Sequence, residues 1–348
     1  MRYYVTEREF DEYDSVTARG KARDDAETIV KELGYMPIVI DVPDRSTYSK
    51  LRKIWWQFKI VPVWIKNLKQ VTKGDELFVQ FPFREHSVFL PLIFRKSRKK
   101  GVKIVMLVHD FELFRALKDS GKTVFDKVKN YFDAKSLKYA SKVILHNEKM
   151  IRAAKDKGLS ELRLIDLQIF DYLTDAPISD KRGLKEPLIV AGNLMKNKSG
   201  YLYELPADLK VNLYGPGYEG EKTDNVNIMG AFPPDELPGR LEGSFGIVWD
   251  GPTAFTCDGV FGKYLTINNP HKTSLYLASG LPVIIWKEAA LADFIVKNGL
   301  GIAVDSLGEI PLRLKSLSEE DYGKMVANTK DISGKLRTGF FLKKALKE

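Results

Sequence analysis

The chain has 348 residues, 44% hydrophobic and 29% charged, a composition that fits a folded protein of two domains and excludes disordered, collagen-like and coiled-coil chains. Its single cysteine, Cys257, excludes intramolecular disulfides and cysteine-cluster metal sites, and predicts a reducing compartment. The formal charge is +9, and residues 51–150 alone hold 22 Lys and Arg against 9 Asp and Glu. This excess predicts an anionic partner: a membrane surface, nucleic acid or a phosphorylated ligand.

The chain has no apolar run as long as a membrane span, and its acidic N-terminus lacks the apolar core of a signal peptide. We therefore expect a cytoplasmic protein.

In the first half of the chain, short β-branched or aromatic runs alternate with helical patterns, which is typical of βαβ units around a parallel sheet. Helices are predicted at 18–33 and at 148–157, the latter between an Asn147 N-cap and Gly158. The predicted strands are 3–6, 37–41, 77–81, 103–108, 143–146 and 162–165. Residues 1–170 are therefore predicted to form one doubly wound α/β domain.

Residues 171–187 lose this periodicity and gather Pro, Gly and charge, as interdomain linkers do. A second α/β domain is expected at 186–330, facing the first across a cleft. The C-terminal segment, 331–348, contains an amphipathic helix at 335–347 and is expected to cross back to the first domain. The further predicted elements are strands at 188–191, 210–214, 225–229, 246–249, 281–286 and 301–304, and helices at 272–278, 289–297 and 319–329.

Three motifs carry candidate chemistry. Residues 215–220 match G-x-G-x-x-G, but no helical pattern follows and Pro216 lacks an N–H group, so we expect a loop rather than a dinucleotide site. Asp110 and Glu112 follow a predicted strand, and they fit a general base, a helix N-terminal turn or a divalent-metal ligand pair. A helix beginning near Pro270 would combine its N–H groups with Lys272 into a diphosphate site, although a capped surface helix has the same pattern.

Residues 268–307, with Asn-Pro-His-Lys and Ser-Gly-Leu-Pro-Val blocks, resemble the C-terminal domain of bacterial β-1,6-galactofuranosyltransferases and of related hexosyltransferases that glycosylate streptococcal adhesins. Arg19-Gly20 departs from a Gly-Ser pair frequent in the family. The resemblance covers nearly the whole chain, with further matches at 18–22, 108–110, 192–193, 246–249 and 336–341.

This resemblance implies the α/β fold called GT-B, with two Rossmann-like doubly wound domains, a UDP-sugar donor mainly in the second, an acceptor mainly in the first, and no metal or cofactor. Lys272 would bind the donor diphosphate. The donor-binding residues implied by the motif matches are Gly192, Asn193, Tyr214, Gly215, Asp250, Gly251, Asn269, His271, Lys272 and Ser274. The acceptor-side residues implied are Arg19, Gly20 and Lys21.

An inverting transfer needs a base for the acceptor hydroxyl, and a cation for the charge that develops on the leaving phosphate. Asp110 is the first choice for the base, and His109 and Glu112 are the alternatives, because residues at strand ends of the first domain face the expected cleft.

The basic half of the chain has a membrane interpretation. Leu51, Ile54, Trp55 and Phe58 are spaced at i, i+3, i+4 and i+7 among basic residues, and a basic run follows at 95–100. This predicts peripheral docking on the anionic inner face of the cell membrane. The alternative is a helix buried through Leu51, Trp55 and Phe58.

The sequence thus predicts a glycosyltransferase that moves a hexose, galactofuranose by first choice, from a UDP-sugar to a lipid-linked or protein-linked surface glycan. The alternatives are transfer of glucose or N-acetylglucosamine, and a non-catalytic relative that binds glycan or a partner protein. We expect no nucleic-acid partner, because no motif of the recognised modules occurs. The sequence is compatible with a homo-oligomer.

Overall fold

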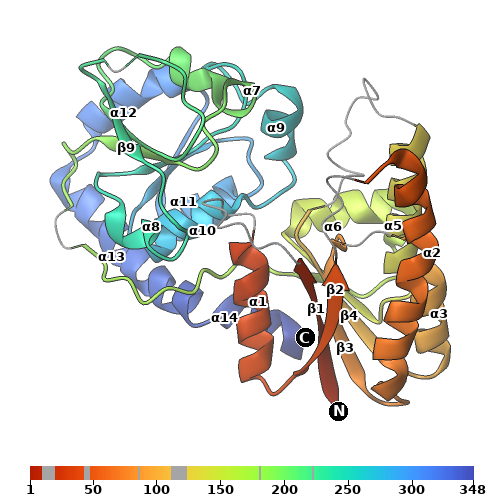
Figure 1. Ribbon diagram of the computed structural model, residues 1–348. Helices are drawn as coiled ribbons and strands as arrows, with labels where there is room; N and C mark the ends of the chain where they lie inside the picture. Colours follow the sequence, from red (N-terminus) through yellow and green to blue (C-terminus); the bar gives the residue numbers. More distant parts are fainter. Residues whose placement is uncertain (10–19, 43–47, 85–86, 111–123, 180–181, 222) are drawn as a thin grey trace. The chain divides into compact units, whose positions relative to one another are not determined.

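The computed structural model describes residues 1–9, 20–42, 48–84, 87–110, 124–179, 182–221 and 223–348. They form two compact units, each built on its own six-stranded sheet (Figure 1). The first unit takes its residues from 1–14, 26–167 and 347–348, and the second from 15–25 and 168–346. The division between the units passes through helix α1 (Lys21–Glu32).

The sheet of the first unit is entirely parallel and has the order β2-β1-β3-β4-β5-β6. Its central strands are apolar on both faces, as expected where helices cover both sides of a sheet. The chain adds β2 on one side of β1 and all later strands on the other side, so the strand order reverses between β1 and β3. The strands are β1 (Arg2–Glu9), β2 (Met36–Val42), β3 (Glu76–Phe81), β4 (Lys103–Val108), β5 (Lys142–Leu145) and β6 (Leu164–Asp166).

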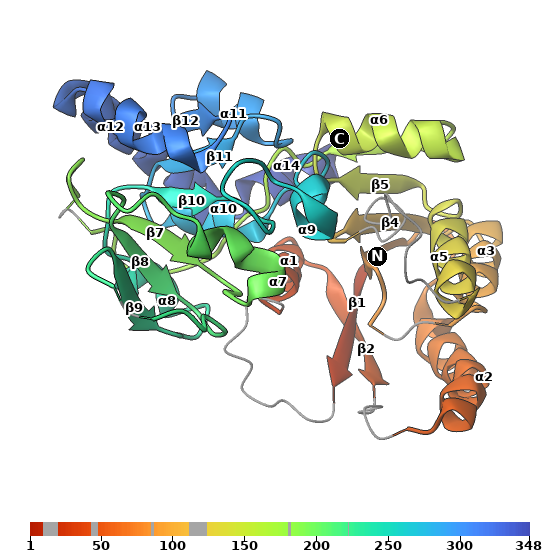
Figure 2. The same cartoon turned by 90° about the horizontal axis from the view of Figure 1, so that it is seen from above.

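Figures 1 and 2 show α1 on one side of this sheet and the next helices, α2, α3 and α5, on the other. The predicted N-cap of α6 is confirmed, because Asn147 Oδ1 accepts a hydrogen bond from Met150 N at 2.9 Å. The helices and helical turns that follow α1 in this unit are α2 (Lys50–Asn67), η1 (Leu68–Gln70), α3 (Leu90–Lys99), α5 (Val124–Leu137), α6 (Glu148–Ala154) and η2 (Lys155–Leu159).

An aromatic cluster decides which side of α2 is buried. The Trp64 ring lies edge-on to both Phe83 and Phe94, with centroids 5.8 Å away in each case, and it is fully buried. Trp64 occupies the sheet-facing side of the helix, so Leu51, Trp55 and Phe58 on other sides are exposed. The alternative interpretation, in which α2 is buried through these three residues, is therefore wrong.

The sheet of the second unit is also parallel, with the order β12-β11-β10-β7-β8-β9. This is the strand order of the Rossmann fold. The chain adds β8 and β9 on one side of β7 and the later strands on the other, so the order reverses between β7 and β10. With these strands, every strand predicted from the sequence is present, three of them with the predicted bounds and the others with ends shifted by at most three residues. The strands are β7 (Leu188–Ala191), β8 (Val211–Tyr214), β9 (Val226–Gly230), β10 (Gly246–Val248), β11 (Val283–Trp286) and β12 (Gly301–Val304).

The helix predicted at 335–347 is two helices, because the chain turns at Gly339 with φ +70°. None of the described helices combines the length and apolar character needed to cross a membrane. The helices and helical turns after β7 are α7 (Lys196–Ser199), η3 (Gly200–Tyr203), α8 (Leu237–Arg240), α9 (Gly259–Tyr264), α10 (His271–Ala278), α11 (Ala292–Lys297), η4 (Leu307–Glu309), α12 (Ile310–Ser316), α13 (Glu319–Arg337) and α14 (Phe340–Lys347).

Helix α10 is held firmly against the second sheet. The Tyr276 ring lies so close to β10 that a Cβ added to Gly246 would come within 2.2 Å of it. Its hydroxyl accepts a hydrogen bond from Ala191 N at 2.7 Å. Ser333 and Arg337 of α13 donate to the carbonyl oxygen of Ala278, at the last residue of α10. These contacts fix where the first turn of α10 lies.

Asp171 caps the last helix, α14. Its two carboxylate oxygens accept hydrogen bonds from Phe341 N (3.1 Å) and Leu342 N (2.8 Å). Burial raises the pKa of this carboxyl to about 7, although the two backbone N–H groups oppose the shift.

Replacing Asp171 with Asn tests this pKa through stability. The native state holds the Asp171 proton more tightly than the unfolded chain, so the carboxyl contributes stability that is lost as pH rises from about 4 to about 7. The loss is about 1.4 kcal/mol per unit of pKa difference. Relative to Asp171→Asn, the free energy of unfolding of the wild type should therefore fall across this window in urea titrations. Parallel pH profiles for the two proteins would contradict the assignment.

Candidate active site

The candidate site lies at the carboxyl ends of the second sheet, where the strand order reverses. Gly192 directly follows β7, Gly215 follows β8, and Asp250 lies two residues beyond β10. Open parallel sheets bind their ligands at this position. Gly192, Gly215 and Asp250 therefore lie at the edge where sheets of this topology bind ligands.

Two glycine loops approach each other closely at this edge. Gly192 has φ +127° and Gly215 has φ +139°, backbone conformations that side-chain-bearing residues rarely adopt. A Cβ on Gly215 would come within 1.9 Å of the Gly192 carbonyl oxygen. Residues 215–220 form a loop between β8 and β9, as predicted.

Lys272, in the first turn of α10, reaches the end of β10. Its Nζ lies 2.8 Å from Asp250 Oδ1 and donates to the Trp249 carbonyl oxygen at 3.0 Å. The two charged side chains are only 11% and 8% exposed. A largely buried ammonium and a helix N-terminus therefore lie together at the strand edge, and both favour an anion.

Three other predicted donor-binding residues have their polar groups engaged within the protein. Asn269 Nδ2 donates to the Gln168 carbonyl at 3.0 Å, and Ser274 Oγ donates to the Phe170 carbonyl at 2.7 Å. Both side chains are buried. Tyr214 is also buried, and its hydroxyl accepts a hydrogen bond from Glu242 N.

Asn193 and Gly251 lie in loops at the same edge. Asn193 is exposed, and its Oδ1 accepts a hydrogen bond from Met195 N at 2.9 Å. Gly251 has φ +129° and donates its N–H to the Lys198 carbonyl at 2.8 Å. Asn193 is therefore held by a hydrogen bond within its own loop, and Gly251 by a hydrogen bond to helix α7.

His271 precedes Lys272, and it is neutral at physiological pH. Burial lowers its pKa to about 4, opposed by a hydrogen bond with the backbone of Asp171 and reinforced by the charge of Lys21. Its ring stacks on Tyr172, with centroids 5.1 Å apart. The positive charge at the start of α10 therefore comes from Lys272 and not from His271.

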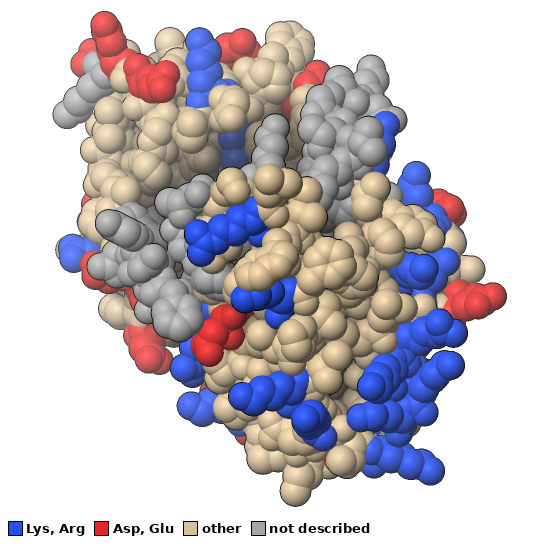
Figure 3. Space-filling view, turned by 45° about the vertical axis from the view of Figure 1, so that its right-hand side comes forward, with Lys and Arg blue, Asp and Glu red and all other residues tan. Residues whose placement is uncertain are grey.

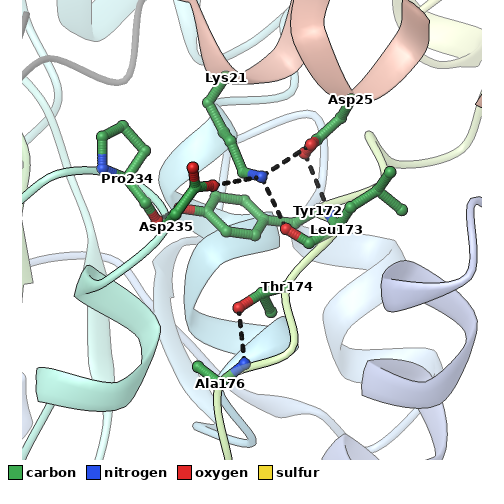
Figure 4. A network of polar contacts seen from close by, with 8 residues as sticks. All are labelled: Lys21, Asp25, Tyr172, Leu173, Thr174, Ala176, Pro234 and Asp235. Carbon is green, nitrogen blue, oxygen red and sulfur yellow. Dashed lines mark hydrogen bonds and ion pairs between the residues drawn. The ribbon is translucent and has the colours of Figure 1, made fainter. Parts of the chain in front are cut away.

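Lys21, an expected acceptor-side residue, is the centre of a polar network in the second unit (Figure 4). Its Nζ contacts Asp25 Oδ1 (2.8 Å), Asp235 Oδ1 (2.9 Å) and the Leu173 carbonyl (2.7 Å). The side chain is only 9% exposed. Gly20 begins α1 by accepting hydrogen bonds from Arg23 N and Asp24 N, and Arg19 lies outside the described residues.

The expected base residues belong to the first unit. His109 follows β4, its Nε2 lies 2.6 Å from Gln80 Oε1, and Gln80 Nε2 donates to Glu27 Oε1 at 3.1 Å. With the amide in this orientation, Gln80 accepts from His109, so the imidazole proton is on Nε2. Asp110 is the next residue along the chain and is half-buried.

Glu112 lies outside the described residues. Within the described ranges, no group of three His, Cys, Asp or Glu side chains is arranged to hold a metal ion.

Sequence reasoning missed the partners that orient these groups. Gln80 is the only strongly polar residue after Glu76 in β3. A polar residue in an otherwise apolar strand was the sequence signal that could have identified Gln80 as a partner. Asp25 and Asp235 gave no such signal, because acidic residues on a helix or in a loop usually face solvent.

Solved structures similar to the whole chain define its class. Sucrose-phosphate synthase from Thermosynechococcus elongatus matches with a TM-score of 0.61 at 12% identity, covering 99% of this chain and 98% of that one. WaaG, a glycosyltransferase of lipopolysaccharide biosynthesis, matches with a TM-score of 0.56 at 10% identity, again covering 99% and 98%. Together with the two parallel six-stranded sheets, these matches define the fold as GT-B.

Residues 2–169 match the N-terminal domain, and residues 188–348 the C-terminal domain, of the glucosyltransferase 3-like family. The chain is 37% identical to the β-1,6-galactofuranosyltransferase WbbI of Escherichia coli over 281 residues, which is 79% of this chain and 78% of that protein. It is 27% identical to glucosyltransferase 3 of Streptococcus parasanguinis, with 79% and 78% covered. The protein belongs to the glucosyltransferase 3-like family and is a hexosyltransferase.

The ion pair between Lys272 and Asp250 makes a prediction about stability. Lys272→Met leaves the buried Asp250 carboxylate without its cation and should lower the free energy of unfolding by about 3–5 kcal/mol. Adding Asp250→Asn removes the stranded charge, so the double variant should recover most of this loss in urea unfolding. A double variant no more stable than Lys272→Met would show that the pair is not the cause.

Proposed function

We propose that this protein transfers a hexose, galactofuranose by first choice, from a UDP-sugar to a growing cell-surface glycan, with inversion and without a metal ion. The 37% identity to a β-1,6-galactofuranosyltransferase supports the sugar. The second unit would bind the donor, and the first unit would supply the group that activates the acceptor.

The observation that carries the proposal is the position of Lys272. Its ammonium lies in the first turn of α10, beside the end of β10, at the point where the strand order of the second sheet reverses. A diphosphate placed there would meet a cation, a helix N-terminus and the backbone of Gly192. Asp250 would accept hydrogen bonds from the sugar and keep Lys272 in place.

The reaction follows from these charges. An acceptor hydroxyl oxygen forms a bond to the anomeric carbon of the donor, and the bond from that carbon to the β-phosphate oxygen breaks. The electron pair of the broken bond stays on the β-phosphate, so negative charge grows next to Lys272. The lysine therefore stabilises the transition state more than the bound substrate. The hydroxyl proton passes to a base of the first unit.

Asp110 is the proposed base, and His109 is the alternative. The hydrogen bonds from His109 through Gln80 to Glu27 support the alternative, because they fix the imidazole in one orientation and one tautomer. A pH profile of kcat/KM separates the two, because an ordinary carboxylate gives an acidic limb near about pH 4 and an ordinary imidazole one near about pH 6.5.

Glucose and N-acetylglucosamine are the alternative donor sugars. The 27% identity to a streptococcal glucosyltransferase 3 supports glucose. Turnover assays with UDP-galactofuranose, UDP-glucose and UDP-N-acetylglucosamine decide among them, and turnover with none of the three would contradict all three donor assignments. The proposed acceptor is a lipid-linked or protein-linked glycan at the inner face of the cell membrane.

Binding of UDP can be tested by thermal unfolding. A ligand that binds only the native state raises the unfolding midpoint, so UDP should stabilise the wild type. Lys272→Met combined with Asp250→Asn should fold and lose this response, because the cation is gone while no buried charge is stranded.

Two controls belong to this experiment. EDTA should leave both the UDP response and turnover unchanged, and strict metal dependence would contradict the metal-independent proposal. Single-stranded RNA should not raise the midpoint. A wild-type protein that does not respond to UDP at all would remove the proposed donor site.

Asp110→Asn tests the base separately from binding. The variant should keep the UDP response, because Asp110 belongs to the other unit, and kcat should fall by about 10²–10⁴, the usual contribution of a positioned base. His109→Gln is the matched comparison. Normal turnover of Asp110→Asn together with a large loss in His109→Gln would transfer the role of base to the histidine.

A further inference from the structure

The outer side of α2 is an apolar surface. Leu51 is 80% exposed, Ile54 and Trp55 are each 54% exposed, and Phe58 is 59% exposed. These residues follow the i, i+3, i+4, i+7 spacing and therefore form one stripe along the helix. Leu92 of the neighbouring helix α3 is also 55% exposed. Large exposed apolar side chains gathered in this way indicate an interaction surface rather than ordinary exposure.

Basic side chains border this stripe. Arg52, Lys59 and Lys66 are spaced seven residues apart, so they form a row along one side of α2. On α3 the exposed basic residues include Arg95, Lys96 and Lys99. Neither helix contains an Asp or a Glu. Figure 3 shows the Lys and Arg side chains gathered over the part of the first unit that α2 and α3 form, beside a broad uncharged area.

We propose that this α2–α3 face, made of the apolar residues Leu51, Ile54, Trp55, Phe58 and Leu92 and the basic residues Arg52, Lys59, Lys66, Arg95, Lys96 and Lys99, docks on an anionic lipid bilayer. The apolar stripe would enter the boundary between headgroups and acyl chains, and the basic side chains would bind anionic headgroups.

The pattern of side chains favours lipid over nucleic acid. Proteins that bind single-stranded nucleic acid pair basic grooves with aromatic rings on which bases stack. Leu51, Ile54 and Leu92 have no aromatic face to offer a base, whereas aliphatic side chains are favourable in the acyl region of a bilayer. The Lys59 ammonium lies 3.9 Å from the centroid of the Trp55 ring, so a cation and an interfacial aromatic residue already adjoin.

This proposal goes beyond the glycosyl transfer proposed above and does not depend on which sugar is transferred. It would hold the enzyme at the membrane where a lipid-linked acceptor lies.

Flotation of the whole protein with lipid vesicles tests the basic part of the face. Wild-type protein should float with vesicles of phosphatidylcholine and phosphatidylglycerol, less with phosphatidylcholine alone, and less at high salt. Arg95→Gln, Lys96→Gln and Lys99→Gln together should lower partitioning about a hundredfold, roughly fivefold for each basic residue near an anionic leaflet. Arg98 is left in place because its Nη1 donates to Ser141 Oγ at 2.8 Å.

The matched control changes the same charge elsewhere. Lys210→Gln, Lys297→Gln and Lys315→Gln together remove three exposed lysines of the second unit and should leave flotation unchanged. The UDP response in thermal unfolding should be equal in all of these proteins. This measurement shows that the variants are folded, and it separates a failure of the docking face from a failure of the donor site.

A second variant tests the apolar stripe. Leu51→Gln, Ile54→Gln and Trp55→Gln together should weaken flotation. The vesicle binding that remains should be more sensitive to salt, because it depends only on electrostatic attraction between the basic side chains and the anionic headgroups. Trp55 fluorescence should shift to shorter wavelength and be quenched by brominated lipid in the wild type. Equal flotation of the basic variant and its control, or binding of single-stranded RNA in place of vesicles, would overturn the proposal.

Discussion

The proposed donor site depends on one ion pair, between Lys272 and Asp250. A charged ammonium that is 11% exposed needs an anion beside it, and Asp250 supplies one at 2.8 Å. In the proposed function the same ammonium binds the diphosphate, so the pair would hold a cation in place at the sheet edge. Its position depends in turn on α10, whose far end is anchored to β7, β10 and α13.

Two other basic side chains of the second unit, His271 and Lys21, add little positive charge to that of Lys272. His271 is adjacent to Lys272 in sequence, but burial keeps the imidazole neutral, so a single cation defines the electrostatics at the start of α10. Lys21 is compensated by two carboxylates and a carbonyl oxygen, and it adds little free positive charge. Helices α2 and α3 of the first unit, in contrast, carry basic side chains and have no Asp or Glu of their own.

The sequence alone predicted the strands and the edge of the second sheet that carries the candidate site. Both depend on local signals: an apolar run, a glycine after a strand and a helix start. It did not predict the contacts of Asp171 with α14, or of Gln80 with His109 and Glu27, because these join residues 29 to 171 positions apart. The polar Gln80 in an apolar strand marks an unusual position but does not reveal its partners.

The sequence left it undecided which side of α2 is buried, for a different reason. The helix has apolar residues on more than one side, so its periodicity fits two orientations. The Trp64 cluster with Phe83 and Phe94 selects one of them, and no spacing rule reveals which aromatic residues will meet.

The glycine pair at 192 and 215 limits how this enzyme can diversify. Position 192 requires a positive φ, and at 215 even a methyl group would collide with a backbone oxygen. Altered specificity would therefore arise from neighbouring loops, such as the one between β10 and α9, where the Phe255 side chain is exposed. A directed-evolution library for new sugar donors would use its diversity best there, with both glycines held constant.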